Sequence, residues 1–341
     1  MDRNGIALSD TFKLQAVNAR DIRLTIDAVA QERALQALDG KRGAIVAMDV
    51  ESGEVYVLAS FPTTEYCAIA SAYSPGTIFQ VVTGTAALQE GKIESGTTFN
   101  CEESIVLGGY EFCCWIFEHG HGHGPQDVIG ALQRCCNIFF YNCGKRTGMP
   151  SLRQWCINYG LGVTTGIDLP REVAGRIPSP TMAAKATLSE VLNHSIGQGE
   201  LLVTPLQIAR MFAAIANGGK VLRPHILLHE GAIPEYKDLR VREETLKLLR
   251  QGMSNVINNV GGLAFAGGMN NFQAVGTTGK ALTVRGQPKH AWFGCYFPEK
   301  LPRFALCVFI EQNDLGHTAT VAAALAVPVA KALEQKYLGA K

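Results

Sequence analysis

The sequence has no long apolar run and almost no net charge. None of its 341 residues lies in an uninterrupted apolar stretch of about 18, the length that a membrane helix needs, so we predict no transmembrane segment. The formal net charge is +1, which gives no electrostatic basis for binding nucleic acid or an anionic membrane surface. The first residues have no basic and apolar leader pattern, so we expect any targeting segment to lie outside this chain.

The composition is that of a globular protein with a substantial core. Apolar residues make up 47% and charged residues 18%, and the length allows one large or two modest domains. Ten cysteines are present, and they form no CxxC pair. We expect most of them to be small buried residues in a reducing environment, because so large a core has little need of a disulfide framework.

Apolar periodicity predicts strands near both ends of the chain and helices between them. Region 22–39 begins extended and becomes a helix capped by Thr25 or Asp27, and a hairpin with its turn at 51–54 follows. Further strands are predicted in "FQAVGTTGKAL", "KHAWFGCYFP" and "RFALCVFIEQ". The remaining helices are predicted after Thr77 and at 129–143, 149–160, 205–217, 241–259 and 320–338.

This order of elements predicts an α+β fold. The economical arrangement is one antiparallel five-stranded sheet, built from 43–60 and 271–311 and flanked by the terminal helices. A mostly helical lobe at about 62–260 would lie beside it, with a cleft between lobe and sheet. We expect residues 1–21 to be a remnant or linker and 22–341 to be a single domain.

Five stretches together resemble the transpeptidase domain of class B penicillin-binding proteins, closest to the elongation type similar to penicillin-binding protein 2. They are "LTIDAVAQ", "GAIVAMDVESGEVYVLASFP", "GLGVTTGIDLPREVAGRIP", "SIGQGELLVTPLQIARMFAAIANGG" and "HAWFGCYFP". The resemblance implies a serine-transpeptidase or β-lactamase-like fold and a role in peptidoglycan synthesis and cell shape. It implies no cofactor, and as partners a peptidoglycan stem peptide or other cell-wall synthesis proteins.

Active members of this family carry three motifs around the cleft. Ser-x-x-Lys supplies a nucleophile and its base, Ser-x-Asn relays a proton, and Lys-Thr-Gly binds the substrate carboxylate beside backbone oxyanion donors. By residue, the resemblance places these motifs at Thr77-Ile78-Phe79-Gln80, Cys135-Cys136-Asn137 and Thr277-Thr278-Gly279.

This chain departs from the family at the side chains that perform the chemistry. Thr77 keeps a hydroxyl but adds a crowding methyl group, and the Gln80 amide has no basic lone pair to accept a proton. Cys135 replaces the relay hydroxyl, and Thr277 removes a cation. Lys280 is the nearest replacement, yet strand alternation should direct it elsewhere. Asn137, Thr278 and Gly279 fit the pattern.

These departures predict a pseudoenzyme, a transpeptidase fold retained for binding or scaffolding. The backbone N–H groups of Thr77 and Lys280 are the donors expected to persist. One alternative is an active D,D-transpeptidase or acyl-transferase that uses Thr77 or Cys135 on stem peptides. Another is a copy with no role of its own.

Two other groupings are weighed. The run "CCWIFEHGHGH" gathers Cys113, Cys114, His119, His121 and His123. Its spacing matches no standard zinc module, so we predict no metal site. Cys135 could act as a thiol nucleophile with Arg134 or a histidine as its partner, but an idle packed thiol is favoured. His194 is expected at the cleft wall or in a loop.

The expected location follows from the resemblance. Family members lie on the outer face of the cytoplasmic membrane, held by an N-terminal helix and a pedestal domain. Both parts are missing from these residues, and the cysteine content fits that compartment poorly. Two alternatives are therefore left for the location. Either these residues are a shortened form of a longer protein of the outer membrane face, or the protein stays inside the cell.

Overall fold

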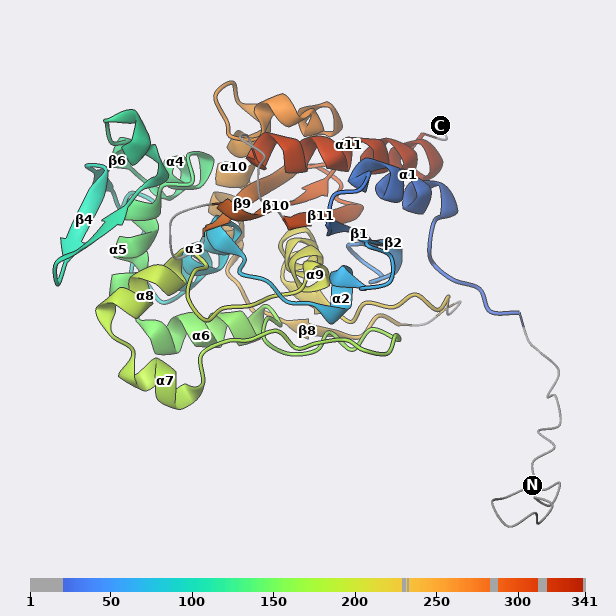
Figure 1. The fold of residues 1–341 in the computed structure, drawn as a ribbon, viewed down its shortest axis with the longest axis horizontal. Coiled ribbons are helices and arrows are strands. Elements are labelled where there is room, and N and C mark those ends of the chain that lie inside the picture. Colours follow the sequence, from blue (N-terminus) through green and yellow to red (C-terminus); the bar gives the residue numbers. More distant parts are fainter. Residues whose placement is uncertain (1–20, 229–230, 232, 283–287, 312–317, 340–341) are drawn as a thin grey trace, which may run out of the picture.

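A five-stranded antiparallel sheet forms the centre of the fold, with strand order β2-β1-β11-β10-β9 (Figure 1). The computed structural model describes residues 21–228, 231, 233–282, 288–311 and 318–339, so the predicted N-terminal segment 1–21 lies almost wholly outside it. The α+β prediction is confirmed, including a sheet that joins the two ends of the sequence. The strands are β1 (Gly43–Asp49), β2 (Val55–Phe61), β9 (Val275–Leu282), β10 (Pro288–Phe297) and β11 (Phe304–Glu311).

Both faces of the sheet are buried, and strand alternation assigns side chains to two separate cores. In β1, Val46 packs into the core shared with α9 (Pro205–Ala216), while Ile45 packs into the core beneath α1 (Ala28–Leu38) and α11 (Thr318–Tyr337). Figure 1 shows α1 and α11 on one face and α9 on the other. Because both faces are covered, the central strands read as continuous apolar runs.

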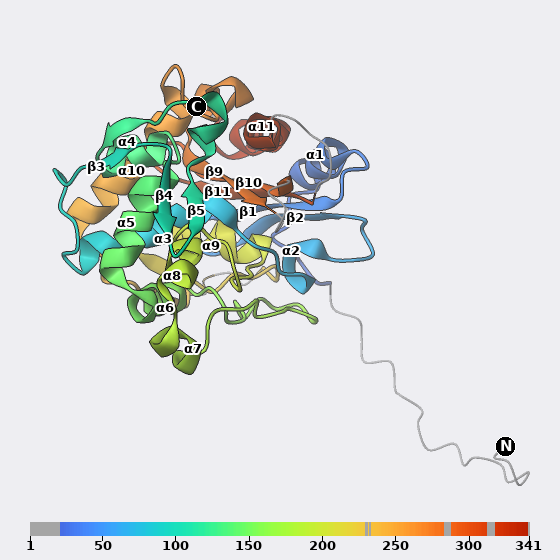
Figure 2. The same cartoon turned by 60° about the vertical axis from the view of Figure 1, so that its left-hand side comes forward.

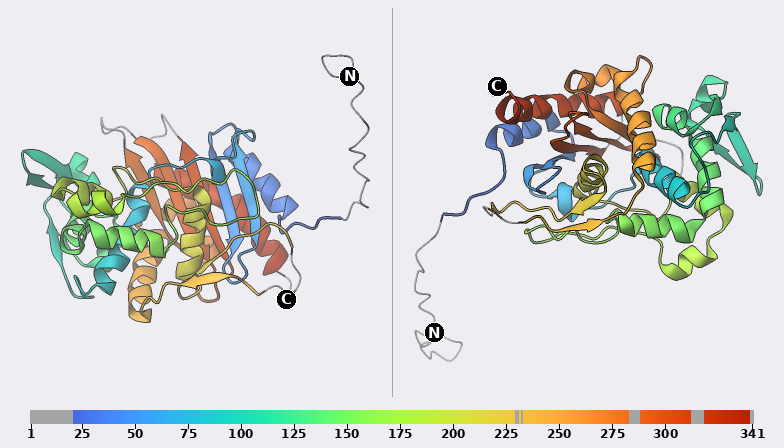
Figure 3. Two further views of the ribbon diagram at one scale, coloured as in Figure 1. Left: turned by 90° about the horizontal axis from the view of Figure 1, so that it is seen from below. Right: turned by 180° about the vertical axis from the view of Figure 1, so that it is seen from behind.

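The predicted lobe covers the sheet face that carries α9 and extends past the β9 edge, where it combines helices with short hairpins (Figures 2 and 3). The sequence pattern did not predict these hairpins. The remaining helices are α2 (Cys67–Ala70), α3 (Gln80–Gln89), α4 (Val128–Gln133), α5 (Asn137–Thr147), α6 (Met149–Asn158), α7 (Pro180–Lys185), α8 (Leu188–Ser195) and α10 (Glu243–Asn258). The short strands are β3 (Phe99–Cys101), β4 (Ser104–Leu107), β5 (Tyr110–Cys113), β6 (Gly124–Gln126), β7 (Lys220–Leu222) and β8 (Tyr236–Asp238). The 3₁₀ turns are η1 (Gly76–Phe79), η2 (Trp115–His119), η3 (Phe265–Gly267) and η4 (Met269–Phe272).

One local prediction is wrong in detail. The single helix expected at 129–143 is interrupted between α4 and α5, because Cys135 adopts a left-handed backbone with φ of 48°. The helix predicted after Thr77 is confirmed: α3 begins at Gln80, and Thr77 itself lies in the 3₁₀ turn η1 that leads into it. Asp27 also caps α1 as expected, since its side chain accepts a hydrogen bond from the backbone N–H of Ala30.

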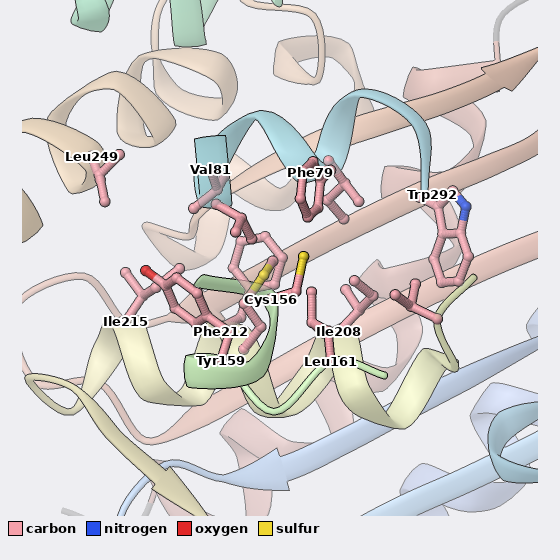
Figure 4. Packing of buried hydrophobic residues seen from close by; sticks show 14 of the residues in the cluster. Phe79, Val81, Cys156, Tyr159, Leu161, Ile208, Phe212, Ile215, Leu249 and Trp292 are labelled. Carbon is pink, nitrogen blue, oxygen red and sulfur yellow. The ribbon is translucent and has the colours of Figure 1, made fainter. Parts of the chain in front are cut away.

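Apolar packing joins the lobe to the sheet at the point where the motifs meet. Figure 4 shows Phe79 of η1, Phe212 of α9 and Trp292 of β10 among the buried residues that fill this region. Each such side chain contributes about 1.5–3 kcal/mol when it leaves water. Apolar packing therefore helps to hold η1 against the sheet.

All ten cysteines are free thiols, and nine of them are buried. Among the described residues, no helix combines the length and apolar character that crossing a bilayer requires.

Candidate functional site

Thr77 faces the outer edge of β9. The strand is an edge of the sheet, so alternate backbone groups have no strand partner on that side. The Thr77 hydroxyl donates to the carbonyl of Thr278 and accepts from the N–H of Lys280, both at 3.4 Å. The hydroxyl therefore takes the place of a neighbouring strand, and one of the two backbone donors expected to persist is directed at it.

Two glycines permit this close approach. A Cβ on Gly76 would lie 2.3 Å from the carbonyl oxygen of Lys280, and one on Gly279 would lie 2.7 Å from that of Pro75. Gly76 also has a φ of 59°, which glycine adopts at little cost. A side chain at either glycine would collide with the opposite backbone, so these two glycines make the close contact between η1 and β9 possible.

Gln80 lies one turn beyond Thr77, fully buried between the lobe helices. Its Nε2 donates to Oδ1 of Asn137 at 3.0 Å and approaches the carbonyl oxygen of Cys135 at 3.5 Å. Asn137 begins α5, and its own Nδ2 donates to the carbonyl of Cys113 at 3.3 Å. The amide of Gln80 thus connects the first and second motifs without a charge.

Cys135 lies in the turn between α4 and α5 rather than at a helix start. Its Sγ is 3.8 Å from Oγ1 of Thr277, which brings the second and third motifs together. Burial raises the pKa of the Cys135 thiol to about 11, so the thiol is neutral near pH 7. A neutral, buried thiol is a poor nucleophile.

The third motif presents hydroxyls and backbone but no buried amine. Thr277 and Thr278 are 2% and 3% exposed, whereas the Lys280 side chain is exposed to solvent. Among the described side chains, no ammonium group forms a hydrogen bond with Thr77. The structure therefore gathers Thr77, Gln80, Cys135, Asn137, Thr277, Thr278 and Gly279 at one place, with Lys280 contributing its backbone.

Among the described residues around Thr77, no group is suited to general-base catalysis. A base must lie within hydrogen-bond reach of the hydroxyl and hold a free lone pair at working pH. The Gln80 amide has no free basic lone pair, so it fails the second condition. The Cys135 thiol would lose its proton, and so become a base, only at a pH near its raised pKa. Three surface cavities of about 210, 270 and 370 Å³ are lined by residues other than these eight.

A second cluster lies behind the second motif. Of the metal-ligand candidates weighed from the sequence, Cys114 and His123 come together, joined by Cys101 and Cys136. Cys113, His119 and His121 are not members of it. Sequence spacing missed Cys101 and Cys136, because they lie 13 residues before Cys114 and 13 residues after His123 and meet the others only after folding.

Comparison with known proteins places these motifs in a family. The sequence matches the family described as "Penicillin binding protein transpeptidase domain" over residues 43–333. It is 26% identical to the peptidoglycan D,D-transpeptidase MrdA of Haemophilus influenzae, over 95% of this chain and 57% of that protein. It is 30% identical to the stage V sporulation protein D of Bacillus subtilis, over 78% of this chain and 45% of that protein. The chain therefore spans about half the length of these curated relatives.

Solved structures with a similar fold are also penicillin-binding proteins. Penicillin-binding protein 2 (PBP2) of Helicobacter pylori superposes with a TM-score of 0.84 at 26% identity, covering 93% of this chain and 64% of that one. PBP2 of Pseudomonas aeruginosa, in complex with WCK 5153, gives 0.84 and 26%, covering 95% and 78%. With the motif geometry described above, these matches show that the chain belongs to the penicillin-binding-protein transpeptidase family, as a class B domain similar to PBP2.

Proposed function

We propose that this domain is a catalytically inactive member of its family that acts in peptidoglycan synthesis by binding or scaffolding. The observation that carries the proposal is the Gln80 side chain, a neutral amide hydrogen-bonded to Asn137 where the family has its lysine base. General-base assistance contributes typically 10²–10⁴-fold to such reactions.

The retained features support binding. Gly76 and Gly279 allow η1 to lie close against the edge of β9, and the backbone donors at Thr77 and Lys280 do not depend on side-chain identity. These features suit the acyl end of a stem peptide without turnover. The partner class that we propose is another cell-wall synthesis protein, since PBP2 of H. pylori has been solved in complex with MreC. The family favours the outer face of the cytoplasmic membrane as the location.

The direct test is intact-mass analysis of the folded chain after incubation with a fluorescent penicillin. We expect no covalent adduct at Thr77 and no release of D-Ala from a stem peptide ending in D-Ala-D-Ala. Calorimetric titration with the same peptide should detect binding. A stable adduct at Thr77, or turnover of the peptide, would show that the domain is an active acyl-transferase.

A further inference from the structure

A surface pocket of about 370 Å³ lies beside α9, between the end of α6 and the β7–β8 hairpin. Figure 1 shows β8 and α6 on the side of α9 that faces away from the sheet. None of the eight residues at the candidate site lines this pocket, so it is a separate feature of the domain. We call it the α9 pocket, and its lining residues lie within 157–165, 221–223 and 235–237, together with Arg210.

Arg210 brings a buried positive charge to the α9 pocket. It belongs to α9, every residue of which is buried, and is itself 5% exposed. Its Nη2 donates to the carbonyl of Gly160, and its Nη1 donates to that of Thr165 at 3.4 Å. Nε is buried without a hydrogen-bond partner. Only neutral carbonyls therefore accept from this guanidinium, which has five N–H groups to donate.

Among the described residues, no carboxylate neutralises Arg210 by direct contact. Glu172 attracts it from a distance, but its two oxygens accept from the backbone N–H groups of Thr165 and Gly166, at 2.6 and 3.0 Å. Burial lowers the pKa of Arg210 to about 10, so the guanidinium keeps its proton near pH 7. A buried charge is costly unless an opposite charge pairs with it, so an anion beside Arg210 would be stabilised.

Two further cations lie around the same pocket. Arg223 follows β7, and Lys237 lies in β8 with its side chain exposed. Among the described lining residues the carboxylate is Glu235, which already pairs with Arg223, with 3.2 Å between Nη1 and Oε2. The described lining therefore holds three cations and one carboxylate, a formal charge of +2. Such a pocket attracts anions and repels cations.

Much of the remaining lining is apolar. Val163, Val221, Leu222 and Tyr236 contribute to it. A bare inorganic ion would leave this surface in contact with water, whereas a ligand with an apolar part would cover it. The lining therefore suits an organic anion better than a simple ion.

We propose that the α9 pocket binds a small organic anion, a carboxylate or phosphate monoester, with its charged group at Arg210 and its apolar part against Val163 and Leu222. The N–H groups of Arg210 that do not donate to carbonyls are the donors that such a group requires, since a guanidinium matches the geometry of carboxylate and phosphate. Lys237 adds attraction at the rim of the pocket. Binding forms no covalent bond, and it is independent of whether Thr77 reacts.

The experiment is titration of the folded chain with three probes, followed by the backbone amide shifts in NMR spectra. Benzoate and phenyl phosphate each carry a ring and an anionic group, and benzamide is the neutral control. We expect saturable shifts at Gly160, Thr165 and Arg223 with an anion and none with benzamide. Tighter binding of benzoate would assign a carboxylate ligand, and tighter binding of phenyl phosphate would assign a phosphate ester.

Two results of this titration would overturn the proposal. One is that neither anion produces saturable shifts at these amides. The other is that benzamide binds as tightly as the anions, which would show that the pocket takes the ring without recognising charge.

Variants identify the cations responsible. Arg210→Met should weaken anion binding ~10-fold or more, because charge-assisted hydrogen bonds are the strong ones. Lys237→Gln should weaken it roughly 2–5-fold, since its exposed charge acts partly through water. The matched control is Lys331→Gln on α11, which removes an exposed charge on the other face of the sheet and should bind as the parent does (Figure 1).

The lysine pair keeps the assignment testable if Arg210→Met does not fold. Weaker binding in Lys237→Gln than in Lys331→Gln would then support the α9 pocket as the site. Equal affinities in these two variants would contradict it.

Discussion

The side chains of Gln80 and Asn137 are hydrogen-bonded to each other, with 3.0 Å between Nε2 and Oδ1. Gln80 is 1% exposed and Asn137 8%, so the bond lies away from solvent. It joins the first turn of α3 to the first turn of α5. The donor in this bond is an amide, which has no basic lone pair near neutral pH.

Restoring the four lost groups should restore acylation. We expect the combined variant Thr77→Ser, Gln80→Lys, Cys135→Ser and Thr277→Lys to form a covalent penicillin adduct, because Gln80 already points at Asn137 and Cys135 already lies beside Thr277. Intact-mass analysis over time measures the adduct. The variant lacking only Gln80→Lys is the control and should react ~10²–10⁴-fold more slowly. Equal rates with and without the lysine would contradict our account of the site.

Removing the Gln80 amide should destabilise the domain. Gln80→Met conserves length but leaves Oδ1 of Asn137 without its donor, and an unsatisfied buried acceptor costs about 1–3 kcal/mol. Denaturant unfolding measures the change. Gln154→Met, on the exposed face of α6, is the control and should change stability by no more than about 0.5 kcal/mol. Equal effects at the two positions would show that the bond carries no net stability.

His194 should make the stability pH-dependent on the acid side. Burial lowers its pKa to about 4, and in the unfolded chain the value returns to the ordinary 6.5. Below pH 6.5 the unfolded chain binds more protons, so the free energy of unfolding falls by about 3 kcal/mol in total as the pH approaches 4. His194→Leu should remove this part of the slope.

Denaturant unfolding at several pH values provides the measurement. Leu192→Ala serves as the control, because it removes buried apolar surface from the same helix and should lower stability equally at every pH. An unchanged acid slope in His194→Leu would show that this imidazole does not titrate with folding.

Cys135 should be unreactive in the folded chain. At pH 8 a thiol of pKa about 11 is about 0.1% ionised, and the side chain is 3% exposed. Iodoacetamide followed by peptide mass mapping should leave Cys135 unmodified until denaturant is added. Rapid labelling in the native state, or peptide turnover that is lost in Cys135→Ser, would favour the thiol-based acyl-transferase instead.

Much of the fold was predictable from local pattern. Continuous apolar runs identified the strands, and Asp27 and Pro205 marked helix starts where the structure has them. Pattern reasoning failed where a tertiary contact overrides local preference. The apolar run 129–143 reads as one helix, yet it is broken at Cys135, whose Sγ lies 3.8 Å from Oγ1 of Thr277, 142 residues away in sequence.

The sequence by itself determined the family, the five-stranded antiparallel sheet flanked by the terminal helices, and the loss of basic side chains, because these depend on residue type and periodicity. Only the tertiary structure decided the left-handed turn at Cys135, the neutral Gln80–Asn137 link and the meeting of Cys101 and Cys136 with Cys114 and His123. The reason is physical: each depends on distances between segments far apart in the chain. Such distances are set by packing of the whole core, and no local pattern encodes them.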